Sequence, residues 1–193
     1  SNLGRFRTRA ELRSDSRWID TGPIAGADWY EILGLESILN VGPLQIVGEY
    51  QTSWVQRDDV TRDTGPDVYF HGGYVYVAYM LTGEHVPYKR TSGTIDRVRP
   101  FENFFLVDTC HDGCAAGWGA WQVALRYSYL DLTDNDVFGG EEHKTTLGLV
   151  WYLNAYSSLQ FNAVYGDIED RYEVGGYTNG HFTALGSRLR DNF

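Results

Sequence analysis

Polar and apolar residues alternate along two neighbouring stretches in the second half of the chain. Residues 119–132 place an apolar or aromatic side chain at every second position, and residues 143–154 repeat this pattern. In the first stretch these positions are Trp121, Val123, Leu125, Tyr127 and Tyr129. A repeat of two residues is typical of a β-strand, whereas a helix repeats every 3.6 residues. Because Asp, Asn and Gly residues separate the two stretches, we predict an antiparallel hairpin.

The same alternation recurs along most of the chain and predicts about eight strands. Their expected limits are 4–13, 28–40, 44–56, 67–82, 119–132, 143–154, 158–168 and 180–193. Short turns are expected at 41–43 and 155–157. The longest interruption, residues 83–118, is too long for a simple turn and is expected at the same end of the sheet as these turns.

The composition fits a membrane protein that is built from strands. Of the 193 residues, 42% are hydrophobic and 15% are aromatic, but no apolar run approaches the roughly 18–20 residues of a spanning helix. Only helices and closed barrels satisfy the backbone inside a bilayer. Aromatic residues also gather near the strand ends, as in the interfacial girdle of a barrel. The predicted fold class is therefore all-β, an antiparallel transmembrane β-barrel.

Positive charge is concentrated near the start of the chain. The net charge of −10 argues against a nucleic-acid-binding protein. Four of the arginines nevertheless lie within the first thirteen residues, namely Arg5, Arg7, Arg9 and Arg13. In a strand, all four side chains share one face with Glu11. That face is either the solvated side of a soluble strand or the lumen side of a barrel. Arg126 lies on the polar side of residues 119–132 and would face the same lumen.

The two cysteines, Cys110 and Cys114, lie in the segment CHDGC. In an oxidising compartment we predict a disulfide between them. A metal site with His111 as a third ligand lacks a fourth ligand, and free thiols are the remaining possibility.

Carboxylates gather around the turn of the predicted hairpin. Asp131, Asp134 and Asp136 are candidate Ca²⁺ ligands, although their spacing is not that of an EF-hand and a solvated turn is the alternative. No other cofactor is expected. The chain has no HExxH, GxSxG or phosphate-binding glycine motif, so we predict that it is not an enzyme.

Several motifs, in their order and spacing, resemble the phosphate-selective porins of the O and P type. They are FRTRAELR at 6–13, IDTG at 19–22, YEILGLES at 30–37, VGPLQIVGEY at 41–50, YVYVAYMLTGEHVPYKR at 74–90, GAWQVALRYSYLDLTD at 119–134, TTLGLVWYLN at 145–154 and the final Phe193. The resemblance implies a homotrimeric outer-membrane barrel of sixteen strands. Residues 1–193 would form the C-terminal half of that barrel, with 83–118 as a long segment between strands. CHDGC matches no part of the family pattern.

The resemblance also implies a function. In that family, arginines along the inner wall draw phosphate or related anions through the pore, and the matching positions are Arg5, Arg7, Arg9 and Arg13. Guanidinium groups stay charged and donate paired hydrogen bonds to oxyanions. On a wall strand they would lie about 6.6–6.8 Å apart. We therefore expect passive, anion-favouring diffusion across the bacterial outer membrane, with lipid and small anions as partners and no nucleic acid.

Two other classes of protein remain open from the residues. One is a small, closed, eight-stranded outer-membrane barrel that serves as a scaffold or adhesin, with its arginines paired to Glu36 and Glu49. The other is a secreted β-sandwich that binds carbohydrate through exposed aromatic residues. The apolar stripe that ends in Trp151 and Leu153 argues against a sandwich unless a second sheet covers it.

Overall fold

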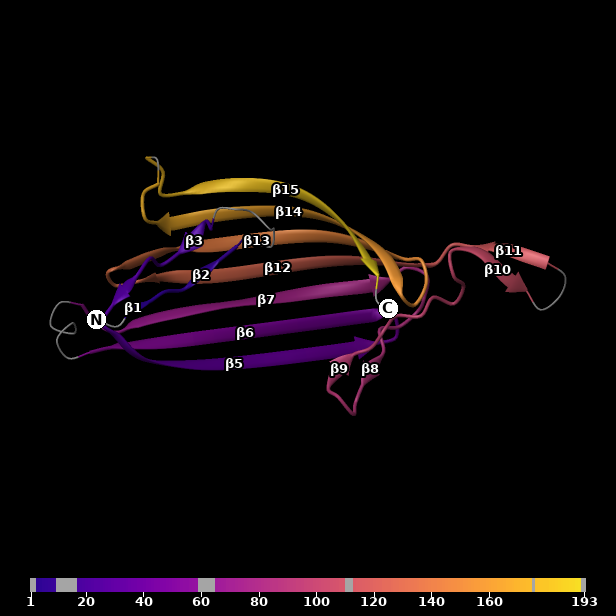
Figure 1. Cartoon of the computed structure of the whole chain (residues 1–193), viewed down its shortest axis with the longest axis horizontal. Helices are drawn as coiled ribbons and strands as arrows, with labels where there is room; N and C mark the ends of the chain where they lie inside the picture. The colour runs from indigo at the N-terminus through magenta and orange to yellow at the C-terminus, as the bar shows by residue number, and fades with distance from the viewer. Residues whose placement is uncertain (1–2, 10–16, 59–64, 110–112, 175, 192–193) are drawn as a thin grey trace.

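The computed structural model describes residues 3–9, 17–58, 65–109, 113–174 and 176–191. Within these ranges the fold is all-β, as predicted, and no helix is long and apolar enough to cross a membrane. Seven long antiparallel strands form one sheet in the order β15-β14-β13-β12-β7-β6-β5 (Figure 1). They are β5 (Ala27–Val41), β6 (Leu44–Arg57), β7 (Val68–Met80), β12 (Ala120–Asp134), β13 (Val137–Tyr152), β14 (Ser157–Arg171) and β15 (Gly180–Asp191).

These seven strands match seven of the eight predicted strands to within a few residues, apart from an earlier start of β13. The prediction of one long strand at residues 4–13 is wrong, as far as the structure describes this range. In its place are β1 (Leu3–Gly4), which pairs with β4 (Ile24–Ala25), and β2 (Arg7–Thr8), which pairs with β3 (Ile19–Asp20). None of these short strands joins the seven-stranded sheet. We call the described residues between 3 and 25 the inward segment.

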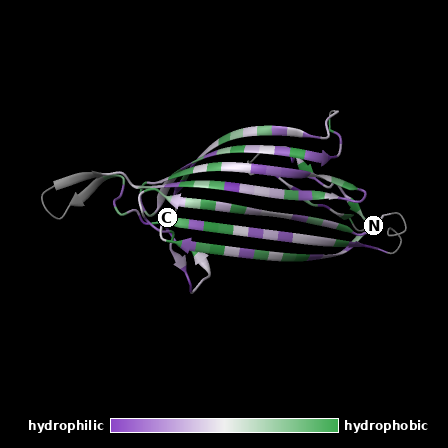
Figure 2. Ribbon diagram, turned by 180° about the vertical axis from the view of Figure 1, so that it is seen from behind, coloured by the Kyte–Doolittle hydropathy of each residue, from purple (hydrophilic) through white to green (hydrophobic). Residues whose placement is uncertain are grey.

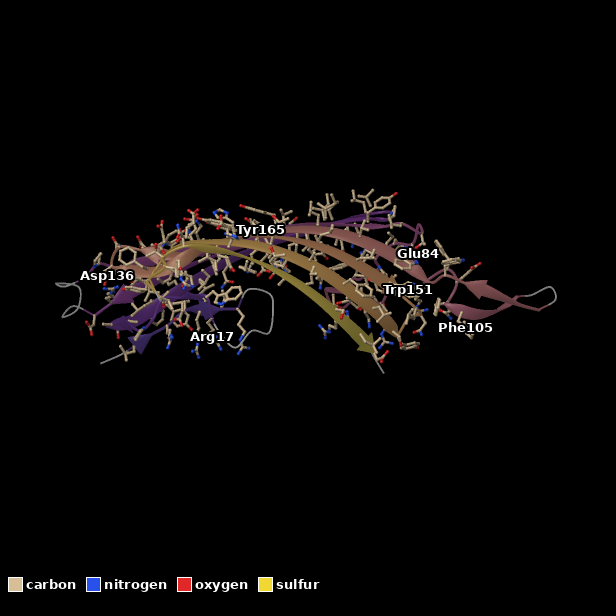
Figure 3. The ribbon with its side chains drawn as sticks, turned by 90° about the horizontal axis from the view of Figure 1, so that it is seen from above. Arg17, Glu84, Phe105, Asp136, Trp151 and Tyr165 are labelled. Atoms are coloured by element: carbon tan, nitrogen blue, oxygen red, sulfur yellow. The ribbon has the colours of Figure 1, made fainter. Side chains whose placement is uncertain are left out.

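The inward segment lies on the concave side of the sheet (Figure 3), where the label of Arg17 marks it. Its Ile19 and Ile24 are each only 1% exposed. They form one hydrophobic cluster with Val55, Val68, Phe70, Leu132, Val137 and Ile168 of the sheet. Alternation of apolar and charged residues therefore has a different cause here, because one side of the segment packs on the sheet rather than on lipid.

The turn between β12 and β13 is shorter than predicted. The two strands pair as far as Asp134 and Val137, and Asn135 between them has a positive φ of 52°. Gly139 and Gly140, expected in the turn, belong to β13. A Cβ on Gly140 would lie 2.9 Å from Ile19 Cδ1. The absence of a side chain at Gly140 thus makes room for the inward segment.

The two faces of the sheet differ in chemistry, and the banding along each strand is visible in Figure 2. The register aligns Leu125, Leu147 and Ala163 on the outer face. Outer-face leucines are exposed, as Leu147 (59%) and Leu185 (81%) illustrate. The predicted apolar faces of the central hairpin are thus confirmed to point the same way, away from the inward segment.

The two ends of the sheet carry different connections. The turns at residues 42–43 and 153–156 and the end of β15 lie at one end, which we call the C-terminal rim (Figure 1). The described residues of the range 81–119 lie at this rim, as predicted for 83–118. They include the hairpins β8 (Tyr88–Lys89) with β9 (Thr94–Ile95) and β10 (Phe105–Thr109) with β11 (Gly113–Gly117). The inward segment lies toward the opposite end, the loop rim. Cys110 falls outside the described residues, so the disulfide stays a prediction.

In the described part of the chain the sheet is open, because β5 and β15 are its two edges and do not pair with each other. The other four sheets there have two strands each. None of them is large enough to cover the outer face as the second sheet of a β-sandwich would.

Candidate functional site

Inner-face side chains from neighbouring strands form rows across the sheet. Tyr74, Ser128 and Lys144 are register partners on β7, β12 and β13. Tyr76, Arg126 and Thr146 form the next row toward the C-terminal rim. Successive rows lie two residues apart along each strand, so their side chains share the inner face.

A cavity of about 400 Å³ lies between these rows and the inward segment. Its described lining includes four cationic side chains, namely Arg7, Arg9, Arg126 and Lys144. Glu49 is the one carboxylate among those lining residues. We call this space the cationic cavity. Two of its cations come from the inward segment and two from the wall. Because Glu49 and Glu142, the partner of Lys144, offset the two wall cations, the excess of positive charge comes from Arg7 and Arg9.

The two wall cations have defined neighbours. The guanidinium carbon of Arg126 lies 4.0 Å from the centre of the Tyr74 ring, a cation–π contact that orients the side chain. Lys144 Nζ donates to Glu142 Oε2 at 2.9 Å, and both side chains are buried. These contacts fix the positions of the positive groups before any solute arrives.

Two arginines of the inward segment have different roles from Arg7 and Arg9. Arg5 Nε donates to Asp20 Oδ1 at 2.7 Å. This hydrogen-bonded ion pair raises the pKa of Arg5 and lowers the pKa of Asp20. Desolvation, followed by the charges of Arg7 and Arg9, lowers the pKa of Arg17. Arg17 therefore belongs to the same cluster of positive charge, whereas Arg5 is neutralised within the segment.

The structure thus brings together three of the five predicted anion-binding residues, Arg7, Arg9 and Arg126. Arg5 is placed in an ion pair with Asp20 and not with Glu36 or Glu49, and Arg13 lies outside the described residues. Lys144 and Arg17 were not predicted. The alternation of residues 143–154 contained a signal for Lys144, because it lies on the side opposite Leu147 and Leu149.

The acidic turn is used for structural contacts. Asp131 Oδ1 accepts from the Thr133 backbone N–H, and Asp134 Oδ2 accepts from that of Tyr69, both at 2.8 Å. Asp136 accepts two hydrogen bonds from Arg57, which lower the pKa of its carboxyl group. Among the described residues, no group of three His, Cys, Asp or Glu side chains is arranged to hold a metal ion. Calcium binding stays a prediction.

Comparison with known proteins places these features in a family. Residues 4–189 match the family model described as phosphate-selective porin O and P. An uncharacterized protein of Caulobacter vibrioides is 33% identical over 165 residues, which cover 84% of this chain and 29% of that protein. Porin O of Pseudomonas aeruginosa is 29% identical over 143 residues, which cover 69% of this chain and 28% of that protein. The chain spans less than a third of the length of these relatives. It belongs to the phosphate-selective porin O and P family, the family that its motifs resemble.

Proposed function

We propose that this chain is part of an outer-membrane porin through which small anions, phosphate or a related oxyanion among them, diffuse passively. Family membership supports a channel rather than an enzyme. The exposed apolar outer face supports contact with outer-membrane lipid. A bacterial outer membrane is accordingly the proposed location.

The complete protein is proposed to be a homotrimer of sixteen-stranded barrels, in which this chain is the C-terminal part. The open edges β5 and β15 support pairing with further strands, because an unpaired edge in lipid leaves backbone groups unsatisfied. The C-terminal rim is the proposed periplasmic side. Its short turns at 42–43 and 153–156 support this orientation, since such barrels carry short turns there.

The observation that carries the proposed anion preference is the composition of the cationic cavity. Arg7, Arg9, Arg126 and Lys144 surround it, with Glu49 as the single carboxylate of its described lining. Guanidinium groups donate paired hydrogen bonds to oxyanions and are weakly hydrated, which favours exchange of bound water for a solute anion.

The inward segment changes how the arginines act. On a wall strand they would form one column along the pore. On the segment, Arg7 and Arg9 face the wall cations Arg126 and Lys144 across the cavity. An anion then meets the excess positive charge of Arg7 and Arg9 opposite a polar wall whose charges balance, with Arg13 proposed to extend the series. Arg5 is proposed to hold the two halves of the segment together through Asp20.

Ion selectivity of the full-length protein in planar bilayers tests this function. Under a potassium chloride gradient, we expect a reversal potential that indicates anion preference. Replacing both Arg7 and Arg9 with Ala should shift the reversal potential strongly toward the value of a cation-selective channel. The control is Arg90→Ala, because Arg90 is exposed on the β8–β9 hairpin, outside the cavity. A cation-preferring channel, or an unchanged reversal potential in the double variant, contradicts the proposal.

A further inference from the structure

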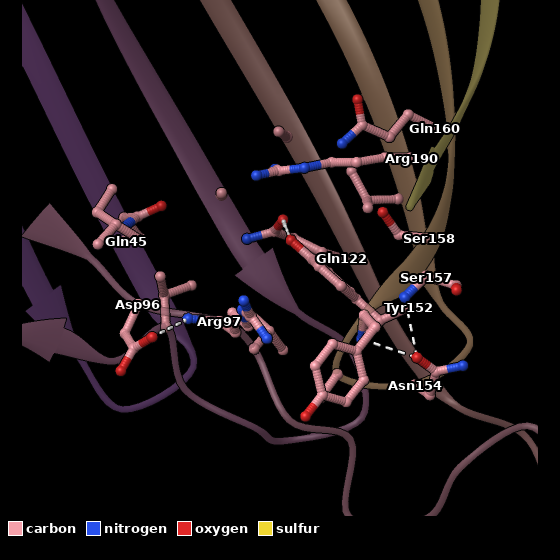
Figure 4. A pocket seen from close by; sticks show the side chains of 18 of the residues that line it. Gln45, Asp96, Arg97, Gln122, Tyr152, Asn154, Ser157, Ser158, Gln160 and Arg190 are labelled. Atoms are coloured by element: carbon pink, nitrogen blue, oxygen red, sulfur yellow. Dashed lines mark hydrogen bonds between the residues drawn. The ribbon is translucent and has the colours of Figure 1, made fainter. Parts of the chain in front are cut away.

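A second, larger cavity of about 890 Å³ lies on the inner face at the C-terminal rim (Figure 4). A row of small residues contributes to this cavity on the side nearer the cationic cavity, where Gln45, Ala78 and Ala124 line it. Ala78, Ala124, Gly148 and Gly186 belong to one row, which Asn40, Gln45 and Asn162 complete. Four of these seven positions carry at most a methyl group, so the wall is recessed there.

Amide and hydroxyl groups dominate the polar lining of this second cavity, which we call the amide cavity. They belong to Gln45, Gln122, Gln160, Asn154, Ser157, Ser158, Tyr76, Tyr152 and Tyr156. Its charged residues are two arginines, Arg97 and Arg190, and two aspartates, Asp96 and Asp191. The formal charges cancel. The amide cavity therefore lacks the excess of positive charge that distinguishes the cationic cavity.

Two of the glutamines are held in fixed positions by tyrosines. The Tyr76 hydroxyl donates to Gln45 Oε1 at 2.7 Å, and the Tyr152 hydroxyl donates to Gln122 Oε1 at 3.0 Å. Gln45 is 3% and Gln122 is 7% exposed. Because each tyrosine occupies the amide oxygen, the amide NH₂ remains as a donor. Gln45 Nε2 has no hydrogen-bond partner within the structure. Because this nitrogen is itself buried from solvent, Gln45 serves to hold the Tyr76 hydroxyl, and the amide donor offered to a ligand is that of Gln122, which lines the cavity.

Part of the long connection encloses this cavity at the rim. Val86 and Val98 pack against Met80 and Ala120, with Tyr152 beside them. Glu84 is 3% exposed and accepts from the Phe101 backbone N–H at 3.1 Å. Residues 95–97, between these anchors, line the cavity. The guanidinium of Arg97 lies 4.9 Å from the centre of the Tyr156 ring. The enclosure is thus a packed element of the structure.

We propose that the amide cavity binds an uncharged, polyhydroxylated solute of the carbohydrate class. Each hydroxyl of such a solute both donates and accepts, which matches fixed amide donors beside serine and tyrosine hydroxyls. Balanced charge offers no preference for an anion, and tyrosine rings offer apolar surface to the faces of a sugar ring. The volume of about 890 Å³ lies within the usual range of small-molecule sites. This site is a different cavity from the cationic cavity, nearer the C-terminal rim of the same inner face.

Block of the channel current by maltotriose tests this site in the full-length protein in planar bilayers. We expect a saturable fall in chloride current as the maltotriose concentration rises. In Gln122→Leu the half-blocking concentration should rise about tenfold, since this variant loses an amide donor of the cavity lining at similar volume. Gln122→Asn keeps the amide and should show a smaller rise. The control Gln56→Leu changes an exposed glutamine on β6 outside the cavity and should leave the block unchanged.

Two results would overturn the site. One is a current that falls only in proportion to maltotriose concentration, as excluded volume alone would produce. The other is a half-blocking concentration that is the same in Gln122→Leu, Gln122→Asn and the unaltered protein. Failure of the proposed anion preference is detected separately, because it changes the reversal potential without sugar. Insertion of each variant is verified by its conductance in the absence of maltotriose.

Discussion

The cationic cavity and the amide cavity lie on the same inner face, yet they are suited to different solutes. Both are lined by residues of β6, β7, β12 and β13. What differs is the segment that faces the wall, because the inward segment brings Arg7 and Arg9, whereas residues 95–97 bring one aspartate and one arginine. The wall therefore supplies a polar surface with balanced charges, and the covering segments determine the net charge of each cavity.

Different interactions stabilise the surroundings of the two cavities. Beside the cationic cavity lie the buried Lys144–Glu142 pair and the cluster around Ile19 and Ile24. In the amide cavity, neutral tyrosine–glutamine hydrogen bonds fix the polar groups. Variants that remove one kind of interaction should therefore affect one end of the inner face and leave the other intact.

The largest effect is expected from Lys144→Met. The Glu142 side chain is fully buried, so loss of its partner leaves a carboxylate in the interior without a cation. Removing one member of a buried ion pair costs about 3–5 kcal/mol. We expect the free energy of unfolding, measured with denaturant in detergent micelles, to fall by about that amount. Maltotriose block should be unchanged.

Two variants make that result interpretable. In Glu142→Gln combined with Lys144→Met, most of the lost stability should return, because no buried charge is left. Lys89→Met, at the exposed lysine of β8, should have little effect. A Lys144→Met protein as stable as the unaltered one would show that the pair does not stabilise this end of the sheet.

A comparable or somewhat smaller effect is expected from Ile24→Ala, which removes packing between the inward segment and the sheet. Ile24 is 1% exposed within the cluster, and truncation of such a residue costs about 2–5 kcal/mol. Anion preference should weaken as well, because Arg7 and Arg9 depend on the position of the segment. Ile95→Ala, at a residue 44% exposed beside the amide cavity, is the control. Equal loss of stability in Ile24→Ala and Ile95→Ala would contradict the role of Ile24 in packing the inward segment on the sheet.

The smallest effect concerns pH. Hydrogen bonds from Arg5 lower the pKa of Asp20 in the folded protein. Their stabilisation is therefore present above the unfolded pKa, about 3.9, and is lost as the pH falls through the lower folded value. Proteolysis within the inward segment by an acid-stable protease should increase over that range. Asp20→Asn should be cleaved more readily at neutral pH and show a weaker pH dependence. Identical pH profiles would contradict the role of the pair.

Much of the wall could be predicted from the sequence, because a strand in a sheet with unlike faces repeats every two residues. Residues 119–132 show this directly, because every second residue from Trp121 to Tyr129 lies on one face and Arg126 lies on the other. The inward segment could not be predicted in the same way. Phe6 alternates with arginines as in a wall strand, but its ring packs on Phe70 at 5.4 Å between ring centres. Alternation reveals that two faces differ and does not reveal what each one contacts.

The sequence by itself determined the all-β class, seven strand positions, the apolar outer face and the family. These depend on local periodicity and on motifs that are continuous in the chain. Only the tertiary structure decided that Arg7 and Arg9 face Arg126 and Lys144, that Arg5 is paired with Asp20, and that residues 95–97 line a cavity. The physical reason is that these contacts join segments far apart in the chain, so no repeat within one strand encodes them.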